Sequence, residues 1–144
     1  MERIKKRLIK ELNYEDVTCY DMDYDNNIVN VFYKDRCFIS FKIPNYYPFR
    51  PIENLMVNNK PVHYYKLGNR HNVRKYFDIQ CICCKSLLCY ENWKLTKTVK
   101  DILDEYDNFK DILNASVLFY YIERKKNLPL DILHNIANYF KKMH

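Results

Sequence analysis

Apolar residues recur along this chain with two different periods. Near the N-terminus Ile4, Leu8 and Leu12 recur every four residues, which is the spacing of one helix face, so residues 2–12 are predicted to form a helix. Beyond this segment the period becomes two, the pattern of strands with one buried face. The predicted strands are 17–23, 28–33, 37–43 and a hairpin of 54–57 with 60–65. On the strand 37–43, the face predicted to be buried carries Cys37, Ile39, Phe41 and Ile43.

A second helical pattern occupies the C-terminal third of the chain. Thr98 and Asp101 have the spacing of a capping box, so a helix is predicted to start there. Its apolar stripe consists of Val99, Ile102, Leu103 and Tyr106. Another helix is predicted from about 108 to 125, and Pro129 then opens a third, because proline fits the first helical position. The face predicted to be buried on this last helix carries Leu130, Leu133, Ile136, Ala137 and Phe140.

The order of these elements indicates the fold class. Strands that precede helices, rather than alternate with them, are typical of an α+β fold. We predict an N-terminal helix, an antiparallel meander of about four strands, an irregular cysteine-bearing segment and C-terminal helices. Residues 67–80 are predicted to be irregular and polar. A chain of 144 residues with 48% hydrophobic content can bury a core, so we predict a single domain over residues 1–144.

Glycine is almost absent, since Gly68 is the only one in 144 residues. Turns that need a positive φ are therefore expected to use asparagine and aspartate, which tolerate that conformation better than other residues with a side chain. The chain is rich in asparagine, lysine, isoleucine and tyrosine, all of which have AT-rich codons. We infer an AT-rich genome, such as that of a large DNA virus, a parasite or an insect symbiont.

Composition also bounds the compartment and the partners. No apolar run reaches the length of about 18 residues that spans a bilayer, and the charged N-terminus lacks the apolar core of a signal peptide. We therefore expect an intracellular location (host cytoplasm or nucleus, or a virion, if viral) and no membrane partner. The net charge of +6, concentrated at the two ends, favours acidic partners, although a solvated surface explains it more simply. We expect no nucleic-acid partner.

Two motifs resemble the ubiquitin-conjugating enzyme (UBC) family. In FISFKIPNYYPFRP, residues 38–51, a strand runs into a proline, a Tyr-Pro-Phe turn and a further proline. In ICCKSLLCYENWKLTKTVKDIL, residues 82–103, an Ile-Cys pair precedes a tryptophan and a helix that begins near a threonine. The resemblance extends from residue 2 to about 106. It implies a UBC-like fold with a divergent helical part over about 107–144.

The resemblance also implies an activity. Cys83 would accept ubiquitin as a thioester from an activating enzyme and, with a ligase, pass it to a substrate lysine, a task that suits the nucleophilic cysteine thiolate. Phe49 and Leu95 match positions that face ligases, and Lys5 and Lys6 match the basic N-terminal helix that binds partners. This transfer needs no cofactor.

One family motif has no counterpart here. The family's cysteine is preceded by His-Pro-Asn, whose asparagine stabilises an oxyanion, and in this chain Phe77 stands six residues before Cys83. The chain could therefore be a catalytically inactive UBC-like module that binds protein partners and has structural or zinc-binding cysteines. Both the enzymatic and the non-enzymatic interpretation stay open.

The segment CICCKSLLC, residues 81–89, holds four of the six cysteines. Cys81 and Cys84 form a C-x-x-C, a common zinc half-site, and Cys89 lies on the following loop. The candidates for a fourth zinc ligand are His71, His63 and Cys83. Adjacent side chains are expected to diverge, so Cys83 and Cys84 are predicted not to share one ion.

Three other interpretations of the cysteines remain beside zinc binding. Cys83 could be the thioester nucleophile, as the resemblance implies. The thiols could simply pack, which is our expectation for Cys19 and Cys37, because cysteine is among the most buried residue types. A disulfide is the least expected outcome in a reducing compartment.

Overall fold

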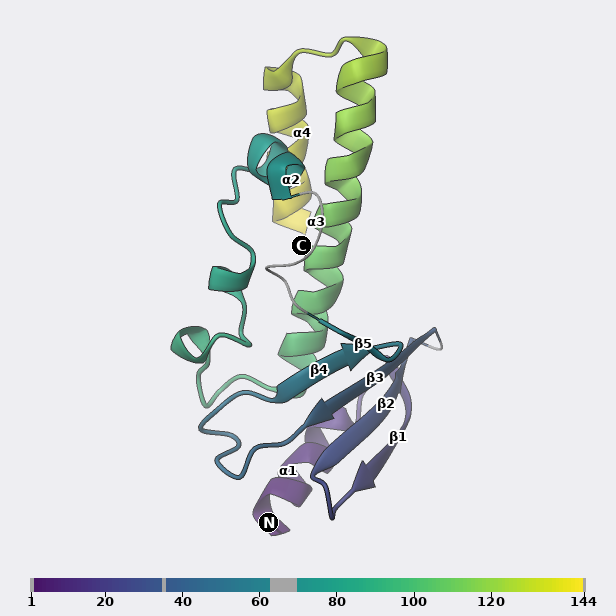
Figure 1. The fold of residues 1–144 in the computed structure, drawn as a ribbon, viewed down its shortest axis with the longest axis vertical. Coiled ribbons are helices and arrows are strands. Elements are labelled where there is room, and N and C mark those ends of the chain that lie inside the picture. Colours follow the sequence, from purple (N-terminus) through teal and green to yellow (C-terminus); the bar gives the residue numbers. More distant parts are fainter. Residues whose placement is uncertain (1, 35, 63–69, 144) are drawn as a thin grey trace. The chain divides into compact units, whose positions relative to one another are not determined.

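The structure is a computed structural model that describes residues 2–34, 36–62 and 70–143. It has an N-terminal helix, a five-stranded antiparallel sheet and C-terminal helices (Figure 1), which confirms the predicted α+β class. The chain divides into two compact units. The sheet unit consists of Met1–His63 and Ser86–Leu103, and the helical unit of Tyr64–Lys85 and Asp104–His144. That residues 1–144 act as a single domain stays a prediction.

The sheet unit contains an antiparallel meander in which each strand pairs with the next (Figure 1). Val31 of β2 pairs with Ile39 of β3, and both side chains are fully buried, as the period-two pattern predicts. The elements of this unit are α1 (Glu2–Leu12), β1 (Val17–Asp23), β2 (Ile28–Tyr33), β3 (Cys37–Lys42), β4 (Glu53–Val57), β5 (Lys60–Pro61) and the 3-10 turn η3 (Tyr90–Asn92).

The turns confirm the expected use of asparagine and aspartate. Five asparagines and one aspartate of the described residues have positive φ, with Lys34 as the one further case. Asn58 and Asn59, at φ 51° and 65°, form the turn between β4 and β5. Between β1 and β2, the Asp23 carboxylate accepts hydrogen bonds from the backbone N–H groups of Asp25 and Asn26. Short polar side chains thus replace glycine at these turns.

A buried carboxylate joins three segments of the sheet unit. Glu11, on α1, accepts hydrogen bonds from Arg7 Nε at 2.5 Å, from the Tyr47 hydroxyl at 2.6 Å and from the backbone N–H of Val99 at 3.2 Å. Burial, together with the bond to Glu11, raises the pKa of Tyr47, so this hydroxyl stays a donor. Arg7 also donates to the carbonyl oxygens of Leu95 and Lys97 at 3.0 Å. These contacts position the loop before α3.

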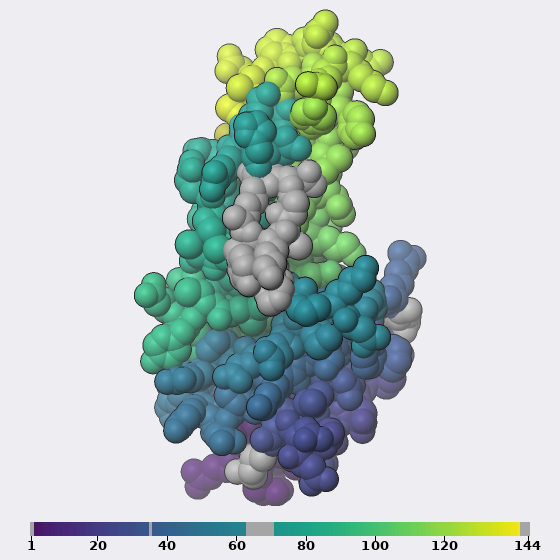
Figure 2. All heavy atoms as spheres, in the orientation of Figure 1, coloured from purple at the N-terminus to yellow at the C-terminus, as the bar shows by residue number. Residues whose placement is uncertain are grey.

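The helical unit is built around α2, which packs on the two other helices (Figure 2, α2 in teal beside the yellow-green part of α3). Phe77 stacks on Phe119 at 5.5 Å between ring centroids and meets Phe140 edge-on at 5.8 Å. Glu123 accepts hydrogen bonds from Lys75 and Tyr76. The elements are α2 (Arg70–Phe77), the 3-10 turn η2 (Cys83–Lys85), α3 (Val99–Lys126), of which residues from 104 onward belong to this unit, and α4 (Leu130–Met143).

Three predictions for this part of the chain were wrong. Residues 67–80 are not irregular throughout, because α2 occupies Arg70–Phe77 and buries Val73, Tyr76 and Phe77. The helices predicted before and after residue 107 are one helix of 28 residues, since no glycine or proline interrupts Val99–Lys126. On α4, Leu133 and Ala137 are fully buried, whereas Leu130 and Ile136 are exposed.

The start of α3 confirms the capping box. The Thr98 backbone N–H donates to Asp101 Oδ2 at 2.8 Å, and the Asp101 N–H donates to Thr98 Oγ1 at 3.3 Å. Within the described ranges, no helix is both long enough and apolar enough to cross a bilayer.

Candidate functional site

The cysteine segment follows α2 and is attached to it by backbone contacts. Asp78 takes a positive φ of 54° and its N–H donates to the Arg74 carbonyl at 3.2 Å, which ends the helix. Arg74 Nε donates to the Gln80 carbonyl at 2.9 Å. Ile79 and Ile82 are buried and anchor the segment on either side of Cys81. The local backbone is therefore fixed at the point where the first cysteine appears.

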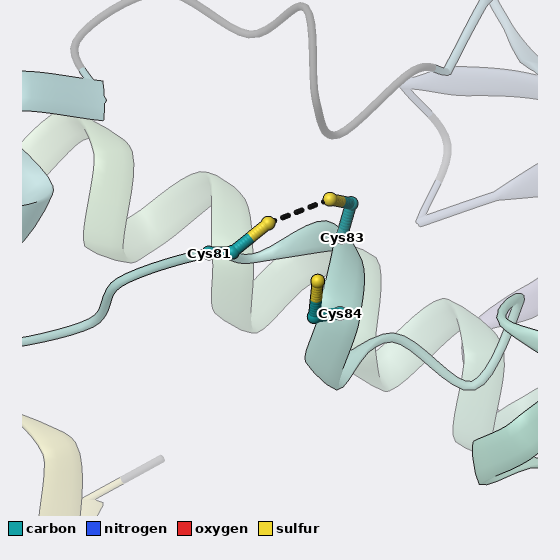
Figure 3. A group of neighbouring side chains, drawn as sticks. All are labelled: Cys81, Cys83 and Cys84. Atoms are coloured by element: carbon teal, nitrogen blue, oxygen red, sulfur yellow. Dashed lines mark hydrogen bonds between the residues drawn. The ribbon is translucent and has the colours of Figure 1, made fainter.

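Three sulfur atoms converge at this segment. The Sγ atoms of Cys81, Cys83 and Cys84 all lie within 4.8 Å of one another, and those of Cys81 and Cys83 are 2.7 Å apart. Figure 3 shows Cys81 directed at Cys83, while Cys84 sends its sulfur toward the same space from the turn η2. Cys84 is exposed and the other two side chains are half-buried. A small ligand could reach the cluster from solvent.

The prediction that Cys83 and Cys84 diverge is wrong. The Lys85 N–H donates to the Ile82 carbonyl at 3.1 Å, so the chain turns tightly as it passes through the two cysteines. This turn brings both sulfur atoms to the side on which Cys81 lies. The signal that could have identified Cys83 as a member of the cluster is the alternate spacing of Cys81-Ile82-Cys83, in which the middle residue is buried and its neighbours share the other side.

The other predicted zinc ligands are not among the three grouped residues of the described chain. His71 is exposed at the start of α2 and is not one of the three residues grouped by their ligand atoms in the described part of the chain. Cys89 belongs to the sheet unit, and His63 lies outside the described residues. Cys19 is exposed and Cys37 half-buried, so neither is one of the fully packed thiols expected on the strands. A fourth zinc ligand stays a prediction.

Hydrogen bonds among the thiols shift the pKa values of Cys81 and Cys84 in opposite directions. Bonds from Cys83 and then from Cys84 lower the pKa of Cys81 from 9.0 to about 7, because they stabilise its thiolate. The same contacts raise the pKa of Cys84 from 9.0 to about 11, since a second negative charge beside Cys81 is unfavourable. Of Cys81 and Cys84, Cys81 is therefore the thiol that ionises first as the pH rises.

The cluster could hold a metal ion. Thiolate–zinc bonds of about 2.3 Å in a tetrahedral site place sulfur atoms about 3.8 Å apart. Here the closest pair, Cys81 and Cys83, is 2.7 Å apart, and all three sulfur atoms lie within 4.8 Å of one another. The closest pair would have to separate for both thiolates to bind one ion. Three sulfur donors are soft ligands, which favour zinc over magnesium or calcium.

The predicted partner-binding residues lie in the sheet unit. Trp93 Nε1 donates to the Pro48 carbonyl at 2.7 Å, and the Trp93 ring lies 6.2 Å from that of Tyr47. This bond joins the loop that carries Phe49 to the loop that carries Leu95. Phe49 is 69% exposed and Leu95 49% exposed. Each loop thus has a buried aromatic anchor, Tyr47 or Trp93, and a large apolar side chain two residues later that is exposed to solvent, Phe49 or Leu95.

The two lysines of α1 differ in their surroundings. Lys5 is half-buried, with its Nζ 4.3 Å from the centre of the Tyr24 ring, and it lines a mostly apolar cavity of about 340 Å³ with Leu8 and Ile43. Lys6 is exposed. Only Lys6 of the pair presents a fully solvated charge to a partner.

Comparisons with known proteins do not extend these observations. No protein-family model, curated protein or solved structure matches this chain. The resemblance to ubiquitin-conjugating enzymes therefore rests on the two sequence motifs.

Proposed function

We propose that this chain is a UBC-like protein-interaction module whose cysteine cluster binds zinc. The observation that carries the proposal is the convergence of three sulfur atoms, from Cys81, Cys83 and Cys84, within 4.8 Å. Partly exposed thiols gain little from packing. Grouped around one ion, however, they become three anionic ligands that hold their segment in one conformation.

In this role zinc would be structural. Cys81, Cys83 and Cys84 would hold the ion, which would link the segment after α2 to the turn η2. Ile79, Ile82 and the Arg74 bond to Gln80 position the cysteines before the ion arrives. That preorganisation supports binding, because less of the segment remains to be ordered.

Partner binding is assigned to the exposed side chains of the sheet unit. Phe49 and Leu95 project from loops that are fixed by Trp93, and aromatic residues on a rigid support are the usual anchors of protein interfaces. Lys6 adds a positive charge on α1. The partner we expect is a protein with an apolar pocket and an acidic rim.

The test of zinc binding is native mass spectrometry with elemental analysis. We expect one zinc per chain in the natural protein, and loss of that zinc in Cys81→Ser and in Cys84→Ser. Cys19→Ser is the matched control, because Cys19 is an exposed cysteine on β1 and should leave the zinc content unchanged. A purified protein with three free thiols and no zinc, even after zinc is added, would refute the proposal.

A second candidate function is supported by the short contact between Cys81 and Cys83. In this proposal Cys83 carries ubiquitin as a thioester, as the family resemblance implies. The Cys83 sulfur attacks the thioester of the activating enzyme, its bond to the ubiquitin carbonyl carbon forms, and the activating enzyme's cysteine leaves as a thiolate. Cys81, 2.7 Å away, is placed to take the Cys83 proton.

The two candidates differ in one covalent product. Incubation with ubiquitin, activating enzyme and ATP should give an adduct that reducing agents remove, that Cys83→Ser abolishes and that Cys19→Ser retains. An adduct that persists in Cys83→Ser would refute Cys83 as the acceptor. If no adduct forms although one zinc is bound, the interaction module is the better description.

A further inference from the structure

The turn between β3 and β4 holds a cation that two aromatic rings keep in place. The Arg50 guanidinium lies 5.4 Å from the ring centre of Tyr46 and 5.4 Å from that of Tyr90. Both rings are exposed, at 66% and 65%. The Arg50 N–H donates to the Tyr46 carbonyl at 3.3 Å, so the turn itself sets the first contact. The Trp93 bond to Pro48 keeps Tyr90 beside the turn.

The Arg50 side chain is ordered without a hydrogen-bond acceptor. Within the described residues it makes no side-chain hydrogen bond and no ion pair, and its contacts are the two rings. An arginine offers five N–H donors in a rigid plane, and stacking on rings leaves the edges of that plane available. Because the rings already restrict its rotamers, an anion that binds here loses less conformational entropy.

A polar recess of about 280 Å³ adjoins this arginine. Its lining includes a second cation, Lys42, and the side-chain amides of Asn27 and Asn45. Lys42 is the register partner of Glu53 in the β3–β4 pairing, and the described residues show no ion pair between the two. The recess thus gathers two cations, one carboxylate and two amide groups, and the two cations suit a phosphate group.

Two further features of the recess indicate which chemical groups the rest of a phosphate-bearing ligand would have. Glu53 also lines the recess, and a carboxylate would repel a free anion but can accept a hydrogen bond from a hydroxyl or amino group. The exposed rings of Tyr46 and Tyr90 offer stacking surfaces beside the recess. A ligand that has an anion, hydrogen-bond donors and a flat ring satisfies all of these groups. At about 280 Å³ the recess is slightly smaller than the roughly 300–1,000 Å³ of typical ligand pockets, so the flat ring of such a ligand would lie outside it, on the exposed tyrosines.

We propose that this recess binds a nucleoside monophosphate. The phosphate lies between Lys42 and Arg50, the ribose or base donates to Glu53, and the base stacks on Tyr46 or Tyr90. This site lies entirely within the sheet unit and does not depend on the cysteine cluster or on the proposed zinc. Nucleotide binding here would be a ligand-sensing property of the interaction module, close to the partner-binding Phe49.

The test is calorimetric titration of the full chain with adenosine monophosphate (AMP), inorganic phosphate and a phosphotyrosyl peptide at low salt. Arg50→Gln should weaken AMP binding by about tenfold or more, because a bidentate arginine contact to phosphate is lost. Arg124→Gln is the matched control. Arg124 also lies over a tyrosine ring, 4.8 Å from the centre of Tyr120, but it belongs to the helical unit.

A second pair of variants distinguishes the contributions of the Tyr46 ring and the Glu53 carboxylate to binding from that of the positive charge alone. Tyr46→Leu should weaken AMP binding more than phosphate binding, and Glu53→Gln should strengthen phosphate binding while it weakens AMP binding. Far-ultraviolet circular dichroism checks that each variant is folded. The proposal is overturned if AMP shows no saturable binding, if Arg124→Gln weakens it as much as Arg50→Gln, or if the phosphopeptide binds this site more tightly than AMP.

Discussion

The first and the last helix of the chain, α1 in the sheet unit and α4 in the helical unit, differ in how many of their apolar residues are buried. On α1, Leu8 and Leu12 are buried and most of the remaining surface is charged. On α4, Leu133 and Ala137 are fully buried, and a second apolar stripe is exposed. The exposed stripe consists of Ile132, Ile136 and Tyr139, which recur at intervals of four and three residues.

The two units also differ in how polar groups support them. Glu11 accepts one hydrogen bond from Arg7 within α1. Its bonds from the Tyr47 hydroxyl and the Val99 N–H connect α1 to a loop and to the start of α3. In the helical unit the Glu123 carboxylate accepts hydrogen bonds from Lys75 and Tyr76 and so links α2 to α3. The segment after α2 carries thiols that are partly exposed. The two units therefore differ in what they leave exposed, which is apolar loop residues and a polar recess in the sheet unit, and the three thiols and the second stripe of α4 in the helical unit.

The largest expected effect is on the Glu11 network. Glu11→Ala leaves the Tyr47 hydroxyl and the Arg7 guanidinium without their buried acceptor, and we expect the free energy of unfolding to fall by about 3 kcal/mol. Trp93, the only tryptophan, reports on this unit, so its fluorescence in a urea titration is the measurement. Glu2→Ala, at the exposed start of α1, should change stability by less than about 0.5 kcal/mol. Equal losses in both variants would contradict the role assigned to Glu11.

The next effect separates the two faces of α4. Leu133→Ala removes a fully buried side chain and should cost about 2–5 kcal/mol, whereas Ile136→Ala, on the exposed stripe, should cost less than about 1 kcal/mol. Circular dichroism during thermal unfolding measures both. A similar loss in the two variants would mean that the second stripe is buried in solution. Dependence of that loss on protein concentration would then identify a second copy of the chain as its cover.

The thiols provide a smaller and pH-dependent contrast. The pKa of Cys81 is lowered to about 7, so its thiolate forms as the pH rises through 7 and its alkylation by iodoacetamide should level off near pH 8. The pKa of Cys84 is raised to about 11, so its alkylation should still increase above pH 9. At pH 7 the thiolate fraction of Cys81 exceeds that of Cys84 by about 5,000-fold, and the lower nucleophilicity of the lower-pKa thiolate offsets part of this, so we expect Cys81 to react about 50–100-fold faster. Peptide mass spectrometry of zinc-free protein measures both rates, and equal rates would show that the thiols do not interact.

Periodicity predicted the sheet unit well because each of its strands buries one face of alternating residues. The pattern of Ile39 and Phe41 depends only on which side of a strand faces the core, and both are buried as predicted. On α4 the same reasoning could not choose between two apolar stripes, because the choice depends on what α2 and α3 place opposite them. The segment 70–77 was missed because it has only three apolar residues, Val73, Tyr76 and Phe77, which follow three polar residues and give little periodic signal in a window this short.

The candidate site was only partly predictable for a similar reason. Cysteine spacing identified Cys81 and Cys84 and left Cys83 as one of three candidates for a fourth ligand. It wrongly predicted that Cys83 and Cys84 diverge, since sequence spacing does not show that the backbone forms a 3-10 turn there. The recess beside Arg50 gave no signal at all. Its groups come from the β1–β2 turn, from β3 and from the turn after it, and only the folded meander brings them together.

The smallest expected effect compares one turn from each unit. Asn59, at φ 65° between β4 and β5, and Asn127, at φ 49° after α3, both occupy the left-handed region. Glycine has no Cβ to oppose this conformation, although it loses more entropy on folding, so Asn59→Gly should raise the free energy of unfolding by about 0.5 kcal/mol. Asn127→Gly should give the same gain if the connection between α3 and α4 is as firmly fixed as the hairpin, since glycine is the preferred residue after a helix end. Urea titrations followed by Trp93 fluorescence for Asn59→Gly and by circular dichroism for Asn127→Gly measure the two gains. A gain in the sheet unit alone would mean that the end of α3 frays, which would locate the weaker order of the helical unit at that connection.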